Sequence, residues 1–142
     1  MSSKTFLDTN VLVYALDEAD PRKQRIASGL AAKAVAGESA ISVQVLAEFA
    51  ATLLQKYPSK FSGDQVLGIL DSLKPVVLIK PDAEMVRRAV EAHATYGVHF
   101  YDGMIIAAAE RGGCARILSE DLAAGQIYFG VAVENPFRAH PK

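Results

Sequence analysis

The stretch FLDTNVLVYALD, residues 6–17, is an apolar segment interrupted by polar residues. Thr5–Leu7 has the composition of a buried strand, and Val11–Leu16 that of a short helix. Asp8 and Asn10 lie between them, although burying an unpaired carboxylate is costly. Asp8 therefore either caps the helix that follows or lies at the end of the strand, where it can bind a ligand.

Short strand-like segments alternate with longer helical segments along the whole chain. The predicted strands are Thr5–Leu7, Ala40–Ser42, Val76–Ile79, Arg116–Leu118 and Val131–Glu134. The predicted helices are Val11–Leu16, Pro21–Ala36, Val43–Tyr57, Gly63–Leu73, Asp82–Tyr96 and Tyr101–Arg111. This alternation predicts an α/β fold, in which helices cover both faces of an open parallel sheet.

Length and composition indicate one globular domain spanning residues 1–142. The chain is 51% hydrophobic and 22% charged, and its net charge of −1 argues against a dedicated polycation. The single cysteine, Cys114, excludes an intramolecular disulfide, so nothing points to secretion. No apolar run approaches the roughly 20 residues of a membrane span. We therefore expect a soluble, cytoplasmic protein.

Acidic residues follow the predicted strands or lie in the predicted helices. The set consists of Asp8, Glu48, Asp102 and Asp121. In an open parallel sheet the carboxyl ends of the strands meet at one edge, and ligands bind there. Carboxylates gathered at this edge repel one another unless a cation lies between them. The set therefore predicts a metal site.

Oxygen ligands of this kind suit Mg²⁺ or Mn²⁺, which usually keep several waters and contact phosphates. No pair of histidines or cysteines has the spacing of a zinc site. A carboxylate-bound Mg²⁺ activates water and stabilises the charge that develops on a phosphoryl group. The pattern thus favours phosphodiester hydrolysis, with Asn10 and Ser119 as accessory polar residues that add no charge.

Each acid also has a structural explanation when it is taken alone. Asp8 and Asp102 are each placed to cap a helix. Glu48 is compatible with a solvent-facing position and Asp121 with an ordinary loop. The four explanations are less convincing together, because they do not explain why four acids that repel one another should lie at the same edge of the sheet.

Four motifs resemble those of the PIN domain, and in particular of the VapC-type ribonuclease toxins of prokaryotic toxin–antitoxin pairs. They are FLDTNVLVYALD, SVQVLAEFA, YDGMIIAAAERGG and LSEDL, at residues 6–17, 42–50, 101–113 and 118–122. The resemblance extends from residue 5 to the terminal ENPF around Asn135–Phe137. Each motif is weak alone, whereas the four in this order and at these separations are specific.

The resemblance implies a three-layer α/β/α sandwich with a central parallel sheet and an Mg²⁺- or Mn²⁺-dependent endoribonuclease. By matching motif, it assigns the catalytic and metal-binding roles to Asp8, Glu48, Asp102 and Asp121, and accessory roles to Asn10 and Ser119. It also implies an RNA substrate such as transfer RNA, an antitoxin that blocks the site, and a homodimer. The helix Val43–Leu54 is apolar on nearly all sides, which fits a subunit contact and equally a helix buried between neighbours.

Arg22, Lys23 and Arg25 begin the second predicted helix, close in sequence to the turn that holds Asp8. We expect them to contact RNA phosphates, because positive charge must offset an acidic site before a polyanion can approach. A solvated helix face explains them equally well.

Other functions are compatible with parts of the pattern. An RNA-processing nuclease that is not a toxin would carry the same acids, and a non-catalytic RNA-binding PIN domain would share the fold. A phosphoryl-transfer enzyme is disfavoured, because Asn10 stands where haloacid dehalogenase-like phosphatases need a second aspartate. Lys80 follows the third predicted strand and not the last, which disfavours a receiver domain.

Overall fold

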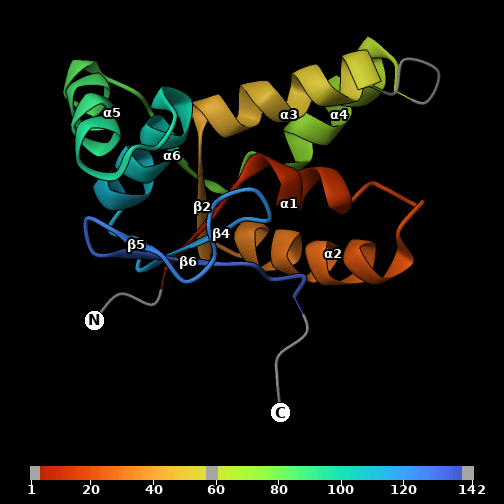
Figure 1. The fold of residues 1–142 in the computed structure, drawn as a ribbon. Helices are drawn as coiled ribbons and strands as arrows, with labels where there is room; N and C mark the ends of the chain where they lie inside the picture. Colours follow the sequence, from red (N-terminus) through yellow and green to blue (C-terminus); the bar gives the residue numbers. More distant parts are fainter. Residues whose placement is uncertain (1–3, 57–60, 139–142) are drawn as a thin grey trace.

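The computed structural model describes residues 4–56 and 61–138, and Figure 1 shows how its elements are arranged. The strands are β1 (Thr5–Leu7), β2 (Ser39–Ser42), β3 (Val77–Ile79), β4 (Arg116–Leu118), β5 (Ile127–Tyr128) and β6 (Val131–Glu134). The helices are α1 (Thr9–Tyr14), α2 (Pro21–Val35), α3 (Val43–Lys56), α4 (Gly63–Ser72), α5 (Ala83–Tyr96) and α6 (Phe100–Arg111). The predicted strands and helices are therefore present, with ends shifted by one or two residues; Tyr57 lies outside the described residues.

The sheet has six strands in the order β3-β2-β1-β4-β6-β5. All neighbouring pairs are parallel except β5 and β6, which are antiparallel. In the centre, Leu7 of β1 is in register with Leu118 of β4. The residues that follow these strands are consequently neighbours, and the Asp8 amide donates to the Leu118 carbonyl at 3.0 Å.

Helices cover both faces of the sheet, as predicted. Figure 1 shows α5 and α6 on one side and α1 and α2 on the other, with α3 and α4 beyond α1. The side chains of Phe6, Leu7 and Ile117 are fully buried between these layers. Within residues 4–56 and 61–138, no helix is both long and apolar enough to span a membrane.

Strand β5 was not predicted. It has two residues, and it pairs with β6 through a tight turn in which Phe129 has φ 50° and Gly130 has φ 81°. A two-residue strand is too short to show an apolar–polar alternation. The sheet is therefore mostly parallel, with one antiparallel edge.

Helix α3 buries one face and exposes part of another. Val45, Phe49 and Leu53 are buried, whereas Val43 is 36% exposed and Leu54 is 45% exposed. Helix α3, which is apolar on nearly all sides, is therefore covered on one face and partly exposed on another.

The hairpin of α5 and α6 is packed unusually closely. An added Cβ on Gly103 of α6 would lie 2.7 Å from the carbonyl oxygen of Ala89 on α5. Ala89 and Ala92 are buried on α5, together with Met85 near its start, whereas Val86 and Val90 are exposed. The small residues are inside because only they allow the two backbones to approach.

Candidate active site

Asp8 occupies the end of β1 and is buried, with 9% of its surface exposed. One carboxylate oxygen accepts a hydrogen bond from the Thr9 amide at 2.8 Å and caps α1. The other accepts a hydrogen bond from the Ser119 hydroxyl at 2.8 Å. The carboxylate therefore caps α1, and it also lies at the end of a strand, facing the loop after β4; that it binds a ligand there stays a prediction.

Ser119 and Asn10 hold that loop in place. The fully buried Ser119 Oγ accepts hydrogen bonds from the amides of Asp121 and Leu122, each at 3.1 Å. Asn10 Nδ2 donates to the Asp121 carboxylate at 3.1 Å, and Asn10 Oδ1 accepts from the Glu120 amide at 3.1 Å. The structure thus joins Asp8, Asn10, Ser119 and Asp121 in one hydrogen-bonded network.

Glu48 approaches this network from α3. The side chain of Gln44, one helical turn earlier, donates to Glu48 Oε1 at 2.9 Å and to the Tyr101 carbonyl at 3.2 Å. This amide links α3 to the first turn of α6. Glu48 and Asp121 line the same groove.

Asp102 lies in the first turn of α6, but it is not the cap. The helix begins at Phe100, and the ring of His99 accepts from the Tyr101 amide as the N-cap. In the described part of the chain, no group donates a hydrogen bond to the Asp102 carboxylate. The capping explanation of Asp102 is therefore wrong, and its carboxylate is left for another role.

The carboxylates of the site repel one another. Burial raises the pKa of Asp8; the hydrogen bonds from Ser119 and Thr9 oppose this, and the charges of Glu48 and Asp121 add to it. Burial also raises the pKa of Asp102, which His99 lowers and the charge of Asp121 raises further. Each aspartate is thus less stable as an anion in the folded chain than in water.

A groove of about 360 Å³ opens beside the network and is lined by Thr9, Asn10, Glu48, Glu120 and Asp121, among others. Among the described residues, no three acidic, histidine or cysteine side chains are close enough to enclose a metal ion. Mg²⁺ does not need such a cage, because it usually keeps several waters and takes one or two carboxylates. The buried Thr9 hydroxyl has no hydrogen-bond partner among the described residues, so the groove also offers an unsatisfied polar group. These donors fit a hydrated divalent cation.

Replacement of Asp102 by Asn is expected to stabilise the metal-free chain by about 0.5 kcal/mol at neutral pH. The substitution removes a charge that burial and Asp121 disfavour, and it breaks no hydrogen bond in the described structure. Folding raises the pKa of Asp102, so the gain in stability from Asn is largest at a pH well above that pKa. The gain vanishes at a pH low enough to protonate the wild-type carboxyl in both the folded and the unfolded chain. Chemical denaturation in a chelator at several pH values measures this. A variant that is less stable at neutral pH contradicts the repulsion.

Glu120, which belongs to the LSEDL motif but was not among the predicted site residues, also lies in the site region. Its carboxylate forms an ion pair with Lys23 and accepts from the Tyr14 hydroxyl at 2.7 Å. The Lys23 ammonium also lies 4.6 Å from the centre of the Tyr14 ring. Glu120 stands beside Asp121 in the chain, but its partners are 97 and 106 residues away, so no local pattern indicates them.

The three basic residues predicted to contact RNA are placed differently from one another. Lys23 is paired with Glu120, and Arg22 donates to the Phe137 carbonyl at 2.7 Å. Arg25 lines a separate cleft on the other side of these contacts. The acids are brought together, whereas the basic trio is not.

Comparisons with known proteins agree with this architecture. A family model described as "PIN domain" matches residues 5–130. A toxin–antitoxin complex from Klebsiella pneumoniae has a TM-score of 0.66 at 20% identity, with 93% of this chain and 97% of that chain covered. VapC20 from Mycobacterium tuberculosis, described as a sarcin-ricin loop cleaving toxin, has a TM-score of 0.64 at 20% identity, covering 82% and 91%. DNA-bound VapBC from Salmonella typhimurium has a TM-score of 0.67 at 16% identity, covering 94% and 98%. A comparison with curated proteins gives no match.

Proposed function

The chain belongs to the PIN domain family, and we propose that it is a divalent-metal-dependent endoribonuclease that acts as the toxin of a toxin–antitoxin pair. The observation that carries this proposal is the set of mutually repelling carboxylates beside one groove at the carboxyl ends of β1 and β4. Their repulsion costs stability, which is the expected price of a site that holds a cation.

Asp8, Glu48, Asp102 and Asp121 would hold Mg²⁺ or Mn²⁺. When bound, such an ion activates water and stabilises negative charge on a phosphoryl group. Ser119 and Asn10 keep Asp8 and Asp121 at fixed positions through their hydrogen bonds. Gln44 orients Glu48 in the same way from α3.

The relatives support the biological side of the proposal. VapC20 is described as a sarcin-ricin loop cleaving toxin, and the Klebsiella pneumoniae structure is a toxin–antitoxin complex. We accordingly propose an RNA substrate and a cognate antitoxin for this chain. The exposed Val86 and Val90 on α5 are suited to contact a second copy, in a homodimer.

The nuclease proposal is tested with purified protein and a structured RNA such as transfer RNA. Cleavage is expected in Mg²⁺ or Mn²⁺, to stop when EDTA exceeds the metal, and to return when the metal is restored. A chain that binds RNA without cutting it at any metal concentration is a binding module, which contradicts the proposal. Cleavage that continues in EDTA contradicts the metal mechanism.

A further inference from the structure

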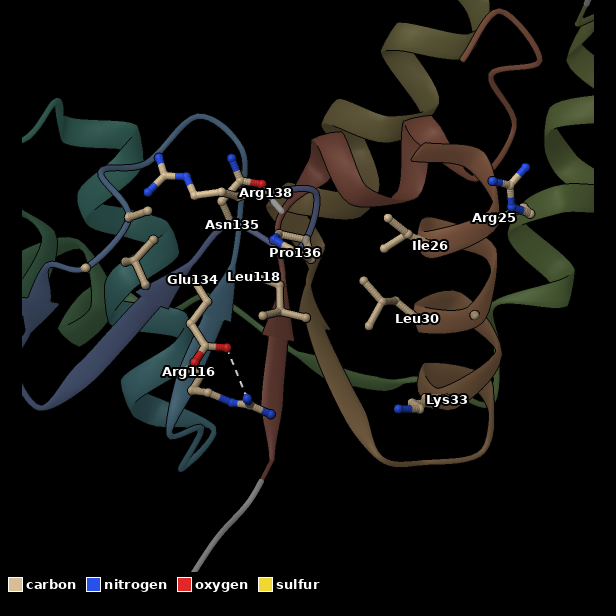
Figure 2. A pocket seen from close by; sticks show the side chains of 14 residues that line it. Arg25, Ile26, Leu30, Lys33, Arg116, Leu118, Glu134, Asn135, Pro136 and Arg138 are labelled. Carbon is tan, nitrogen blue, oxygen red and sulfur yellow. Dashed lines mark hydrogen bonds and ion pairs between the residues drawn. The ribbon is translucent and has the colours of Figure 1, made fainter. Parts of the chain in front are cut away.

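A second, larger cleft of about 710 Å³ lies between α2 and the strands β4 and β6. Ile26 and Leu30 point into it from α2, and Leu118 faces them from β4 (Figure 2). The floor of this cleft, defined here as the α2 cleft, is therefore apolar. Its lining contains none of the four acids of the candidate active site.

The charged residues that line the α2 cleft are Arg25, Lys33, Arg116, Arg138 and Glu134. Arg116 forms an ion pair with Glu134 at 3.0 Å, which neutralises the acid. Figure 2 shows Lys33 and Arg116 extending into the cleft from opposite walls, and Arg25 and Arg138 extending outward at its other end. The α2 cleft thus combines an apolar floor with a strongly positive rim, in a chain whose net charge is −1.

Cations without a partner gather at this cleft. Within residues 4–56 and 61–138, those with neither an ion pair nor a hydrogen bond from the side chain are Arg25, Lys33, Lys80, Arg87 and Arg138. Three of these five line the α2 cleft. The remaining two, Lys80 and Arg87, lie elsewhere, whereas other basic side chains outside the cleft are paired, as Arg88 is with Glu110 and Arg111 with Asp82.

A cluster of three contacting side chains, called here the ridge, joins the two openings: Tyr14 lines the acidic groove, and Pro136 and Arg138, the chain neighbours of Phe137, line the α2 cleft. It consists of Tyr14, Lys23 and Phe137, with the two rings edge to face at 4.9 Å. Lys23 lies over both rings, at 4.6 Å from Tyr14 and 5.7 Å from Phe137. Arg22 fixes the ridge from below by donating to the Phe137 carbonyl. A strand that crosses this ridge passes from the acids to the free cations.

We propose that the α2 cleft binds a single-stranded segment of RNA on the far side of the ridge from the acidic groove. This inference rests on the proposed function and names where the substrate is held. The acidic groove repels a polyanion, so the attraction must come from cations outside it, and unpaired cations attract phosphates without first breaking an ion pair. The apolar floor suits an unstacked base, which single strands offer and duplexes hide.

An acidic amphipathic peptide is the other ligand that such a cleft can take. RNA is favoured because the ridge joins residues of the acidic groove to residues of the cleft, so that one extended strand can contact both openings.

The test is equilibrium binding of a labelled single-stranded RNA of about 20 nucleotides in excess EDTA, so that no cleavage is needed. The variant is the triple substitution Arg25→Gln, Lys33→Gln and Arg138→Gln, which removes charges that have no partner in the described structure. The matched control is Lys80→Gln with Arg87→Gln, which removes the remaining unpaired cations away from the cleft. Thermal unfolding verifies that both variants are folded.

The triple variant is expected to bind RNA about tenfold more weakly, and its plot of log affinity against log salt is expected to be shallower by about 2. The control is expected to match the wild type in both measurements. Equal weakening in the two variants, or none in the triple variant, overturns the proposal. A triple variant that keeps RNA binding but loses affinity for an acidic amphipathic peptide assigns the cleft to a protein ligand and also overturns it.

The experiments distinguish a failure of the cleft assignment from a failure of the proposed nuclease function. If the wild type cuts no RNA but the triple variant binds RNA more weakly than the control, the proposed function is wrong and the cleft stands. If the wild type cuts RNA and the triple variant binds it normally, the cleft assignment is wrong and the proposed function stands.

Discussion

Asp8→Asn is expected to lower RNA cleavage at least about a thousandfold and to abolish the growth arrest caused by expression of the wild type. Asp8 is the most buried of the four acids and lies at the centre of the site, between the cap of α1 and the Ser119 hydroxyl. Asn keeps the shape and one acceptor oxygen but removes the charge that would hold a cation. The Asn side-chain NH₂ would also lie either beside the Thr9 amide, which is itself a donor, or beside the Ser119 Oγ, which already accepts hydrogen bonds from two backbone amides. One hydrogen bond of Asp8 is therefore lost in either orientation.

Asp17→Asn is the matched control. Asp17 lines the same groove and the substitution changes the net charge by the same amount, but it lies outside the hydrogen-bonded network of Asp8. Its cleavage rate is expected to stay within about threefold of the wild type. Sequencing of cellular RNA ends after induction compares the three chains. New ends and growth arrest that persist with Asp8→Asn rule out the assigned role, and their absence with the wild type favours an RNA-processing or binding role.

Gly103→Ala is expected to reduce the free energy of unfolding by about 2 kcal/mol or more. The added Cβ would lie 2.7 Å from the Ala89 carbonyl oxygen and 3.2 Å from Ala89 Cα. Both are backbone atoms of α5, so the contact cannot be relieved by a side-chain rotation, and α5 and α6 must separate. Asp102 precedes Gly103 in α6, so the same shift would displace a carboxylate of the site.

Gly68→Ala is the matched control for Gly103→Ala. Gly68 is also inside a helix, α4, but an added Cβ meets nothing within 4 Å there. Alanine is the better helix former, so this substitution is expected to raise the free energy of unfolding by about 0.5–1 kcal/mol. Denaturant titrations of both variants in EDTA therefore should give changes of opposite sign. Equal changes would show that Gly103 is not needed for close packing.

That the four acids lie near one another was predictable, because each follows a predicted strand or lies in a predicted helix. Asp8 and Asp121 follow predicted strands, and parallel strands bring their carboxyl ends to one edge whatever the exact register. The capping role of Asp8 was predictable too, but not that the carboxylate which caps α1 would also accept a hydrogen bond from Ser119. The partners of Glu120 could not be found, because they depend on how α2 packs beside the loop after β4.

Helix α5 shows why a correct helix can have an unexpected buried face. The spacing of Val86, Ala89, Val90 and His93 predicts the helix, and the largest apolar residues would ordinarily mark its inner side. Close contact with α6 at Gly103 selects Ala89 for the interior instead, and the valines face outward. The distance between two helices depends on both sequences at once, so the pattern of one helix does not reveal it.

The pairing of β1 with β4 also has a consequence for the timing of activity during synthesis. Asp8 and Ser119 contact each other across 111 residues of sequence, and Asp121 is held by hydrogen bonds to Ser119 and Asn10. A ribosome therefore releases the first acid long before the last, and a chain stopped before β4 carries no assembled site. Translation of such a nuclease is expected to leave its own messenger and ribosome intact until β4 and the loop after it have emerged.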